Sequence, residues 1–268
     1  MRAAGDLRPD RVHLLAALSE EWSAIETLVH DLTPHQWLLP TPCPDWDVRD
    51  QLAHIVAAEY ALAGHFGRPG DLPESELYAA VAMFMVDVRE ETPRALLGRF
   101  RDITADRLAA LADLDDERWS TPTWTPVGPG TVDRLLRLRV FDCWMHEQDM
   151  RDALVRPGHE SGAAAEIVLD EIGAALGWLL AKQARVPTGT VVTLAAFGDL
   201  SRTWHVVVDE RASVVADPPR RADTTVPLPT GTLTRLCGGR IEPSAATVQI
   251  EGDVELGHRI VASLRLTG

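Results

Sequence analysis

The sequence predicts an α+β protein, in which a helical part of about two thirds of the chain is followed by a small unit of strands and helices. Up to about residue 184, apolar residues recur at the spacing of amphipathic helices. After Pro187 the pattern changes to short runs of β-branched residues with turn residues between them. Because this change lies near residue 186, we expect two domains, residues 1–186 and 187–268.

The helical part is divided by residues that start or stop helices. Asp47, Thr92 and Thr131 each stand where a side chain can cap a first helical turn, and Pro93 follows at the first helical position. The runs LTPHQWLLPTPCPDW and WSTPTWTPVGPG are rich in turn residues and are predicted to be loops. Helices are expected at about 11–32, from 48 onward, 73–91, 93–114, from 132 to beyond 146, and 161–184.

The C-terminal part alternates between strand and helix patterns. Strands are predicted at TGTVVTLAAFG, RTWHVVVDE, ASVVAD and ATVQIEG, because each run is rich in β-branched residues. A short helix is expected at TGTLTRLCGG and a final helix at about 254–264. These elements together predict a small α+β domain.

Charge and cysteine content restrict the functions that are open to the chain. Its 26 basic and 40 acidic residues give a formal net charge of −14, which opposes binding to nucleic acids and to anionic membranes. No apolar run is long enough to span a bilayer, and the first residues lack the apolar core of a signal peptide. Cys43, Cys143 and Cys237 are too scattered for a disulfide framework. We therefore expect a cytoplasmic protein with no nucleic-acid or membrane partner.

The most informative motif is the pair Asp142 and His146. Residues four apart lie on the same face of a helix, and here that face is otherwise apolar. A buried acid and imidazole must be paired, hydrogen-bonded or metal-bound, and together they can form half of a transition-metal site. The alternative is a buried ion network, because Arg139 lies on the same flank and could pair with Asp142.

His54 is the best candidate for a further ligand. It lies on a helix face that carries mostly alanine, which would let another helix approach and would place the imidazole in the gap. The alternative is an ordinary surface or core histidine. Asp149 faces the same side as Asp142 and is expected to be an ion-pair partner or to orient a ligand from behind.

Two residues near these motifs, Trp46 and Cys143, are expected to have structural roles, and a third, Cys43, is a thiol in a loop. Trp46 directly precedes a helix and should pack the incoming chain against it. Cys143 points away from Asp142 on the helix and is predicted to be a packed thiol. No His or Lys flanks Cys43 in the sequence to lower its pKa, so reactivity is not predicted for it.

Several segments together resemble a known family. TPCPDWDVRDQLAHI (41–55), GPGT (128–131) and RVFDCWMHEQDMRDAL (139–154) resemble the mycothiol-dependent maleylpyruvate isomerases of the DinB-like metalloenzyme superfamily. LCGGR (236–240) and VQIEGDVELGHRIVASL (248–264) are similar to the sterol-carrier-like domain often attached to them. The resemblance covers nearly the whole chain. It implies an N-terminal DinB-like four-helix bundle followed by a small sterol-carrier-like α+β domain.

The resemblance also implies a site. Carried over to this sequence, the family's ligands for a divalent metal, most simply zinc, are His54, Asp142 and His146. The best-known member has Glu where this chain has Asp142, and both carboxylates bind zinc. Arg240 is the candidate catalytic cation, in contact with an anionic substrate across the domain interface; a surface arginine at a turn is the alternative.

The expected activity is that of a metal-dependent enzyme that uses the low-molecular-weight thiol mycothiol. By resemblance, the thiol occupies the open metal position, and its thiolate adds to the cis double bond of a maleylpyruvate-like substrate, so that rotation and elimination give the trans isomer. A thiol S-transferase would use the same activation. Two alternatives stay open, a non-catalytic metal-binding or regulatory DinB-like protein and a metal-assisted hydrolase.

Overall fold

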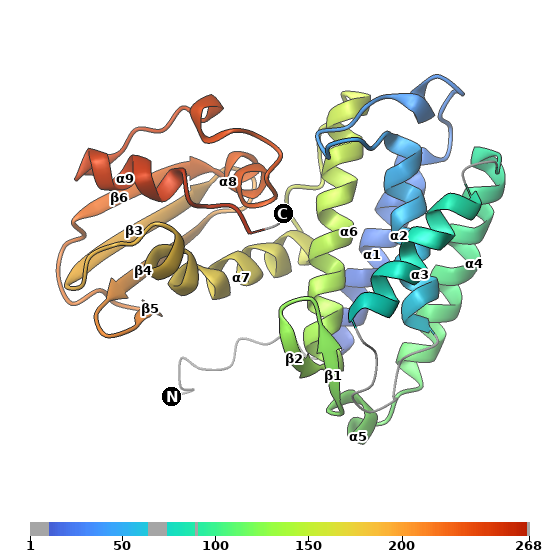
Figure 1. Ribbon diagram of the computed structural model, residues 1–268, viewed down its shortest axis with the longest axis horizontal. Coiled ribbons are helices and arrows are strands. Elements are labelled where there is room, and N and C mark those ends of the chain that lie inside the picture. The colour runs from blue at the N-terminus through green and yellow to red at the C-terminus, as the bar shows by residue number, and fades with distance from the viewer. Residues whose placement is uncertain (1–10, 64–73, 89–90, 267–268) are drawn as a thin grey trace. The chain divides into compact units, whose positions relative to one another are not determined.

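The computed structural model describes residues 11–63, 74–88 and 91–266. It confirms the predicted α+β class, with a helical region followed by a unit that contains a sheet (Figure 1). The chain forms two compact units, a helical unit that ends at His159 and a C-terminal unit that begins at Glu160. None of the described helices is long and apolar enough to cross a membrane.

The helical unit is built around four long helices. Helix α1 packs against α4 and α6, and α2 packs against α3, α4 and α6, so that the apolar faces form a common core. Their bounds are α1 (Arg11–Val29), α2 (Val48–Ala63), α4 (Pro93–Ala112) and α6 (Val132–Leu154), with α3 (Glu74–Asp87), a short α5 (Asp116–Trp119) and a 3-10 turn (Gln36–Leu38) beside them.

Two of the predicted caps are present. The Asp47 carboxylate accepts a hydrogen bond from the Asp50 amide at 2.8 Å, at the start of α2. The Thr92 hydroxyl accepts one from the Ala95 amide at 3.3 Å, at the start of α4. Thr131 stands at the N-cap of α6 as predicted, but its hydroxyl donates to Asp133 instead of capping an amide. The starts of α2 and α4 are therefore set by local polar contacts.

The predicted loop before α6 contains a hairpin instead. Strands β1 (Pro122–Thr125) and β2 (Gly128–Thr131) pair antiparallel, and the Thr125 hydroxyl donates to the Gly128 carbonyl at 2.5 Å. Gly128 has a φ of 109°, which favours glycine. The prolines in this segment argue against strands when the sequence is considered alone. Each strand of a two-stranded ribbon, however, has one edge without ladder hydrogen bonds, where proline is tolerated.

The C-terminal unit contains a five-stranded sheet in the order β5-β4-β3-β6-β7. Strand β3 is antiparallel to β4 and parallel to β6. Helix α7 packs against β4 and β5, α8 against β3 and β6, and α9 against β6. The bounds are α7 (Ala163–Trp178), a π-helical turn (Leu179–Gln183), β3 (Thr190–Phe197), β4 (Arg202–Val208), β5 (Ala212–Val215), β6 (Thr224–Pro229), α8 (Thr230–Cys237), β7 (Glu251–Gly252) and α9 (Val254–Val261).

Strand β6 is not among the strands that the sequence predicts, and it contains Pro227 and Pro229, residues that are uncommon in a strand within a sheet. The structure explains how they are tolerated. Strand β7 pairs only with Thr224 and Thr225, so the rest of β6 has a free edge on that side. The predicted strand ATVQIEG is therefore shorter than expected, because only its last two residues, Glu251 and Gly252, pair with the sheet.

Helix α7 belongs to the C-terminal unit, although the change in sequence pattern lies later, near residue 186. It approaches the sheet closely at Gly173, where an added Cβ atom would lie 2.4 Å from the Trp204 indole nitrogen. A helix can thus precede the strands in the chain and still share their core.

Candidate metal site

Three predicted ligands meet between α2 and α6. His54 Nε2 lies 3.3 Å from Asp142 Oδ2, and His146 Nε2 lies 3.5 Å from Asp142 Oδ1. The two imidazole centroids are 4.7 Å apart. One ligand atom from each residue lies within 4.8 Å of the other two. Both Nε2 atoms therefore face a single carboxylate.

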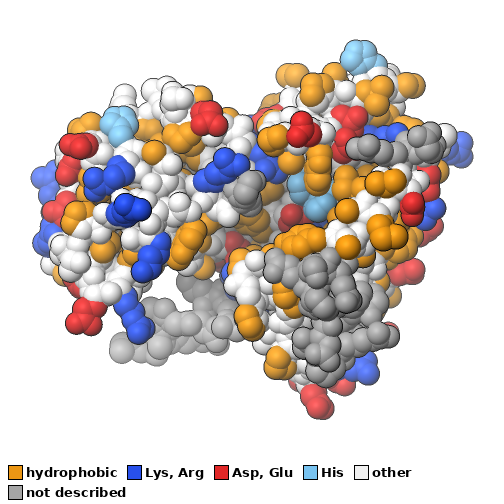
Figure 2. Space-filling view, viewed as in Figure 1, with side chains coloured by type: hydrophobic (Ala, Val, Ile, Leu, Met, Phe, Trp, Pro, Cys, Tyr) orange, Lys and Arg blue, Asp and Glu red, His pale blue; other side chains and the backbone are white. Residues whose placement is uncertain are grey.

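The helices bring these side chains together through their small and apolar residues. Ala57 and Ala58 are buried on α2, close to His54 in the sequence, and α2 packs against α6. His54 thus lies toward α6 as the alanine-rich face predicts. The side chains of His54 and Asp142 are 19% and 36% exposed, so the cluster is partly open to solvent. Figure 2 shows histidine beside acidic side chains at the surface of the helical unit.

Trp46 and Cys43 also belong to this neighbourhood, although the sequence predicts only a packing role for Trp46 and no activating neighbour for Cys43. The Trp46 ring lies 4.9 Å from the His54 ring and 5.4 Å from the His146 ring, centroid to centroid. Cys43 Sγ lies within 4.8 Å of ligand atoms of His146 and Asp149. The absence of a neighbouring histidine in the sequence was therefore misleading. Both residues lie in the TPCPDW segment. Their position just before the helix that carries His54 is the only feature of the sequence that indicates that they lie near the histidines.

Asp149 stands behind His146. Its Oδ2 atom is 3.6 Å from His146 Nδ1, slightly beyond hydrogen-bond length, and its side chain is only 2% exposed. The nitrogen that faces away from Asp142 therefore has a carboxylate beside it. This is the position of the outer partner that fixes the tautomer of a metal-binding histidine.

Arg139 joins Asp142 to a buried ion network. Its Nη1 donates to Asp142 Oδ2 at 2.6 Å and its Nε donates to Glu59 Oε1 at 2.9 Å. Glu59 Oε2 in turn accepts from Arg107 Nε at 3.0 Å. The ion pair that was the alternative to a metal site is thus present beside the cluster. Because Arg139 holds Oδ2, Oδ1 is the oxygen left facing His146.

These contacts shift the pKa values of the cluster in different directions. Burial would raise the pKa of Asp142, but the charges of Arg139, His146 and His54 together hold it well below its usual range. Burial lowers the pKa of His54 more than Asp142 raises it. For His146 burial is outweighed by Asp142 and Asp149, so its pKa is raised. The low pKa of Asp142 and the lowered pKa of His54 favour a cation, whereas the raised pKa of His146 means that a cation must displace a proton from this imidazole.

The donor set fits a divalent metal. Two imidazole nitrogens and one carboxylate oxygen are ligands that zinc accepts, and three protein ligands leave a coordination position open. The fit rests on the two Nε2 atoms that face Asp142 and on Asp149 behind His146.

Arg240, the predicted catalytic cation, lies in the C-terminal unit just after α8. Its Nη1 donates to the Gly238 carbonyl at 2.7 Å, and its amide donates to the Arg235 carbonyl at 2.8 Å. These contacts stabilise the turn after α8. They correspond to the alternative of an arginine at a turn, and the predicted substrate contact stays a prediction.

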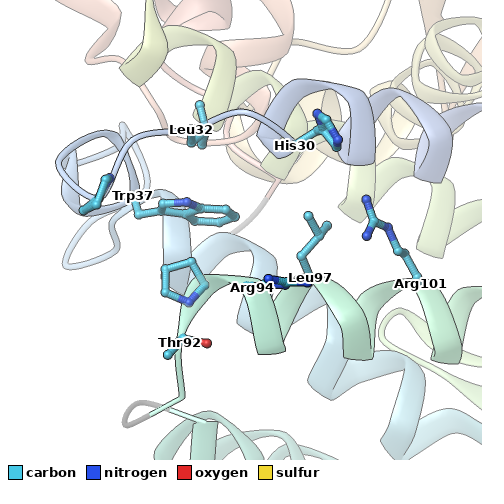
Figure 3. Close-up of a pocket in the computed structure, with 9 residues that line it drawn as sticks. His30, Leu32, Trp37, Thr92, Arg94, Leu97 and Arg101 are labelled. Atoms are coloured by element: carbon cyan, nitrogen blue, oxygen red, sulfur yellow. The ribbon is translucent and has the colours of Figure 1, made fainter.

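A separate cavity of about 460 Å³ lies elsewhere in the helical unit (Figure 3). Trp37 and Leu97 give it apolar surface, while His30, Arg94 and Arg101 stand around it. None of the predicted ligands lines it, so it is not part of the metal site.

Comparisons with known proteins give the family and the fold. The sequence pattern described as "Mycothiol maleylpyruvate isomerase N-terminal domain" matches residues 18–151, which include all three predicted ligands. No curated protein matches the sequence.

Two solved structures share the fold. The crystal structure of the mycothiol-dependent maleylpyruvate isomerase superposes with a TM-score of 0.60 at 16% identity, covering 92% of this chain and 95% of that one. A histidine-to-alanine mutant of it gives 0.57 at 15% identity with the same coverage. At these identities the likeness shows the fold alone, and it extends over both units. Because the family pattern spans half of the sequence, the chain belongs to the mycothiol maleylpyruvate isomerase family, which is a family of enzymes.

Proposed function

We propose that this protein is a metal-dependent isomerase that uses mycothiol as a thiol co-substrate and acts on a small, anionic cis-alkene of the maleylpyruvate class. The second activity that this proposal includes is that of a thiol S-transferase, which would activate the thiol in the same way. The observation that carries the proposal is the approach of two imidazole Nε2 atoms, from His54 and His146, to the single carboxylate of Asp142. Family membership supports the choice of thiol and of reaction class.

In this proposal His54, His146 and Asp142 hold a divalent ion, with zinc the simplest choice for this ligand set. When bound, the ion supplies a positive charge that favours the thiolate form of a thiol beside it. Arg139 donates to Asp142 Oδ2 and helps to keep this carboxylate ionised beside the two imidazoles. Asp149 faces His146 Nδ1 and favours the tautomer with its proton there.

The chemistry proceeds through the substrate. The thiolate adds to one carbon of the cis double bond, and the electron pair moves into the conjugated carbonyl. Rotation about the new single bond and expulsion of the thiolate then restore the double bond as trans. No net oxidation occurs and the thiol is regenerated. Trp46 lies against both imidazoles, and Arg240 is the proposed cation for the substrate's anionic group.

The test is turnover of maleylpyruvate by zinc-loaded protein with and without mycothiol. Turnover that rises with mycothiol and disappears in His54→Ala and His146→Ala is expected, together with loss of about one metal equivalent per chain. Activity that persists without any small thiol would instead favour metal-assisted hydrolysis. Absence of turnover with a full metal site would favour a binding protein.

A further inference from the structure

A second group of ionisable side chains lies in the helical unit. Glu21 on α1, Glu147 on α6 and His159 after α6 each offer one ligand atom, and these atoms lie within 4.8 Å of one another. Glu147 directly follows His146 in α6. Successive helical residues point about 100° apart, so this group occupies a different face of α6 from the His54 cluster.

Glu21 is the unusual member of the group. It is 0% exposed, and neither carboxylate oxygen has a hydrogen-bond partner among the residues that the structure describes. Its Oε2 atom lies 3.7 Å from His159 Nδ1. A buried carboxylate without partners is costly, so Glu21 requires either a proton or a cation.

The charges of the side chains around Glu21 do not balance unless a proton or a cation is added. Glu147 Oε1 is paired with Arg151, at 2.7 Å from Nε and 2.6 Å from Nη2. Its Oε2 lies 2.6 Å from His159 Nδ1. Glu20 Oε1 lies 3.6 Å from His159 Nε2. Three carboxylates thus lie around His159, and Arg151 is paired with one of them, so these groups carry a net charge of −2 while the imidazole is neutral.

Two occupants could balance this charge. Protonation of Glu21 and His159 would do so, but an acid proton can serve only one Glu21 oxygen, and neither of the two oxygens has a hydrogen-bond partner within the described part of the chain. A divalent ion would balance the same charge and could engage both Glu21 oxygens. We propose that Glu21, Glu147 and His159 bind a second divalent cation, of the class that accepts mixed carboxylate and imidazole ligands.

The backbone around His159 is held in place for this role. The Trp144 indole donates to the His159 carbonyl at 2.9 Å, and the Gln148 amide donates to the Gly158 carbonyl at 3.2 Å. His159 itself has a φ of 59°, an uncommon conformation that persists only when its surroundings hold it. The second cation would join α1, α6 and the segment that leads into the C-terminal unit, which is a structural role.

The test is zinc binding to untagged, metal-free His54→Ala/His146→Ala protein, which lacks two ligands of the first site. This variant should bind about one zinc ion per chain, and zinc should raise its unfolding temperature. Adding Glu21→Gln should weaken binding by at least the roughly tenfold cost of losing even an outer partner of a ligand. Adding Glu26→Gln, a change at a half-exposed position of the same helix whose carboxylate pairs with Arg101, should leave binding unchanged.

The proposal is overturned if the double variant binds no zinc, or if Glu21→Gln leaves its affinity unchanged; Glu21 would then be held by a proton. His159→Asn provides a second variant in case Glu21→Gln does not fold, because asparagine tolerates the positive φ, and it should weaken binding as well. If wild type and the double variant bind equal amounts of zinc, the first site fails while the second stands.

Discussion

Asp142 is the residue whose role differs most between the two interpretations of the site, a metal site and a buried ion network. It faces both imidazoles and is also paired with Arg139. Asp142→Asn keeps the shape and removes the charge, so we expect a clear loss of zinc affinity with the helical circular dichroism unchanged. Asp142→Glu should retain the metal, because the resembling family uses that acid. Asp152→Asn, at an exposed position on the same helix, is the control. Equal zinc affinity of Asp142→Asn and wild type would leave Asp142 with the ion network alone.

Cys43 allows the site to be probed chemically. It is half-buried, whereas Cys143 and Cys237 are buried, and burial raises the pKa of both buried thiols. Iodoacetamide should therefore label Cys43 first in the folded protein, as measured by peptide mass spectrometry. Zinc should slow this labelling, because Cys43 lies beside His146.

His54→Ala removes a ligand without removing Cys43, so it should abolish the protection by zinc. Protection that persists in His54→Ala would show that zinc acts elsewhere on the protein. Labelling of Cys143 or Cys237 at the same rate as Cys43 would contradict the burial that distinguishes the three thiols.

At the scale of elements, the packing of α1 against α6 places Glu21 in the core, and its burial is the main reason that its pKa is raised well above the usual range. In chelator-treated protein, folded Glu21 keeps its proton while the unfolded chain loses it. The contribution of this proton to the free energy of unfolding is therefore fully present below about pH 4.5. It is lost as the pH rises toward the pKa of folded Glu21, by at most about 1.4 kcal/mol per pH unit.

Glu21→Gln cannot titrate, so its free energy of unfolding in urea should fall less between pH 5 and pH 8 than that of wild type. Glu26→Gln on the same helix should follow wild type. Parallel curves for wild type and Glu21→Gln would mean that Glu21 ionises normally in the folded, metal-free protein.

At the scale of the whole molecule, the role proposed for Arg240 can be tested separately from the proposed metal ligands. Arg240 belongs to the C-terminal unit and the proposed ligands to the helical unit. If Arg240 binds the substrate's anionic group, Arg240→Gln should raise KM for maleylpyruvate about tenfold or more, since a charge-assisted hydrogen bond contributes about 1.5–3 kcal/mol, and should leave zinc affinity unchanged. Arg259→Gln, at another arginine of the same unit, is the control. An unchanged KM with intact folding would assign Arg240 to the turn after α8 alone.

The sequence by itself determined the features that depend on neighbours along the chain. The caps at Asp47 and Thr92, the helical periodicity of the bundle and the pairing of Asp142 with His146 all involve residues within one helical turn. The placement of His54 toward α6 followed from the alanine-rich face of its helix and from the family resemblance, and the structure brings the two histidines together.

Only the tertiary structure decided the features that depend on packing between distant segments. It brought Trp46 and Cys43 to the histidines and buried Glu21 against Glu147 and His159. It also made strands of proline-containing segments by giving them free edges. Propensity and spacing describe local preferences, and these are overridden when burial or a free strand edge changes which conformation is stable.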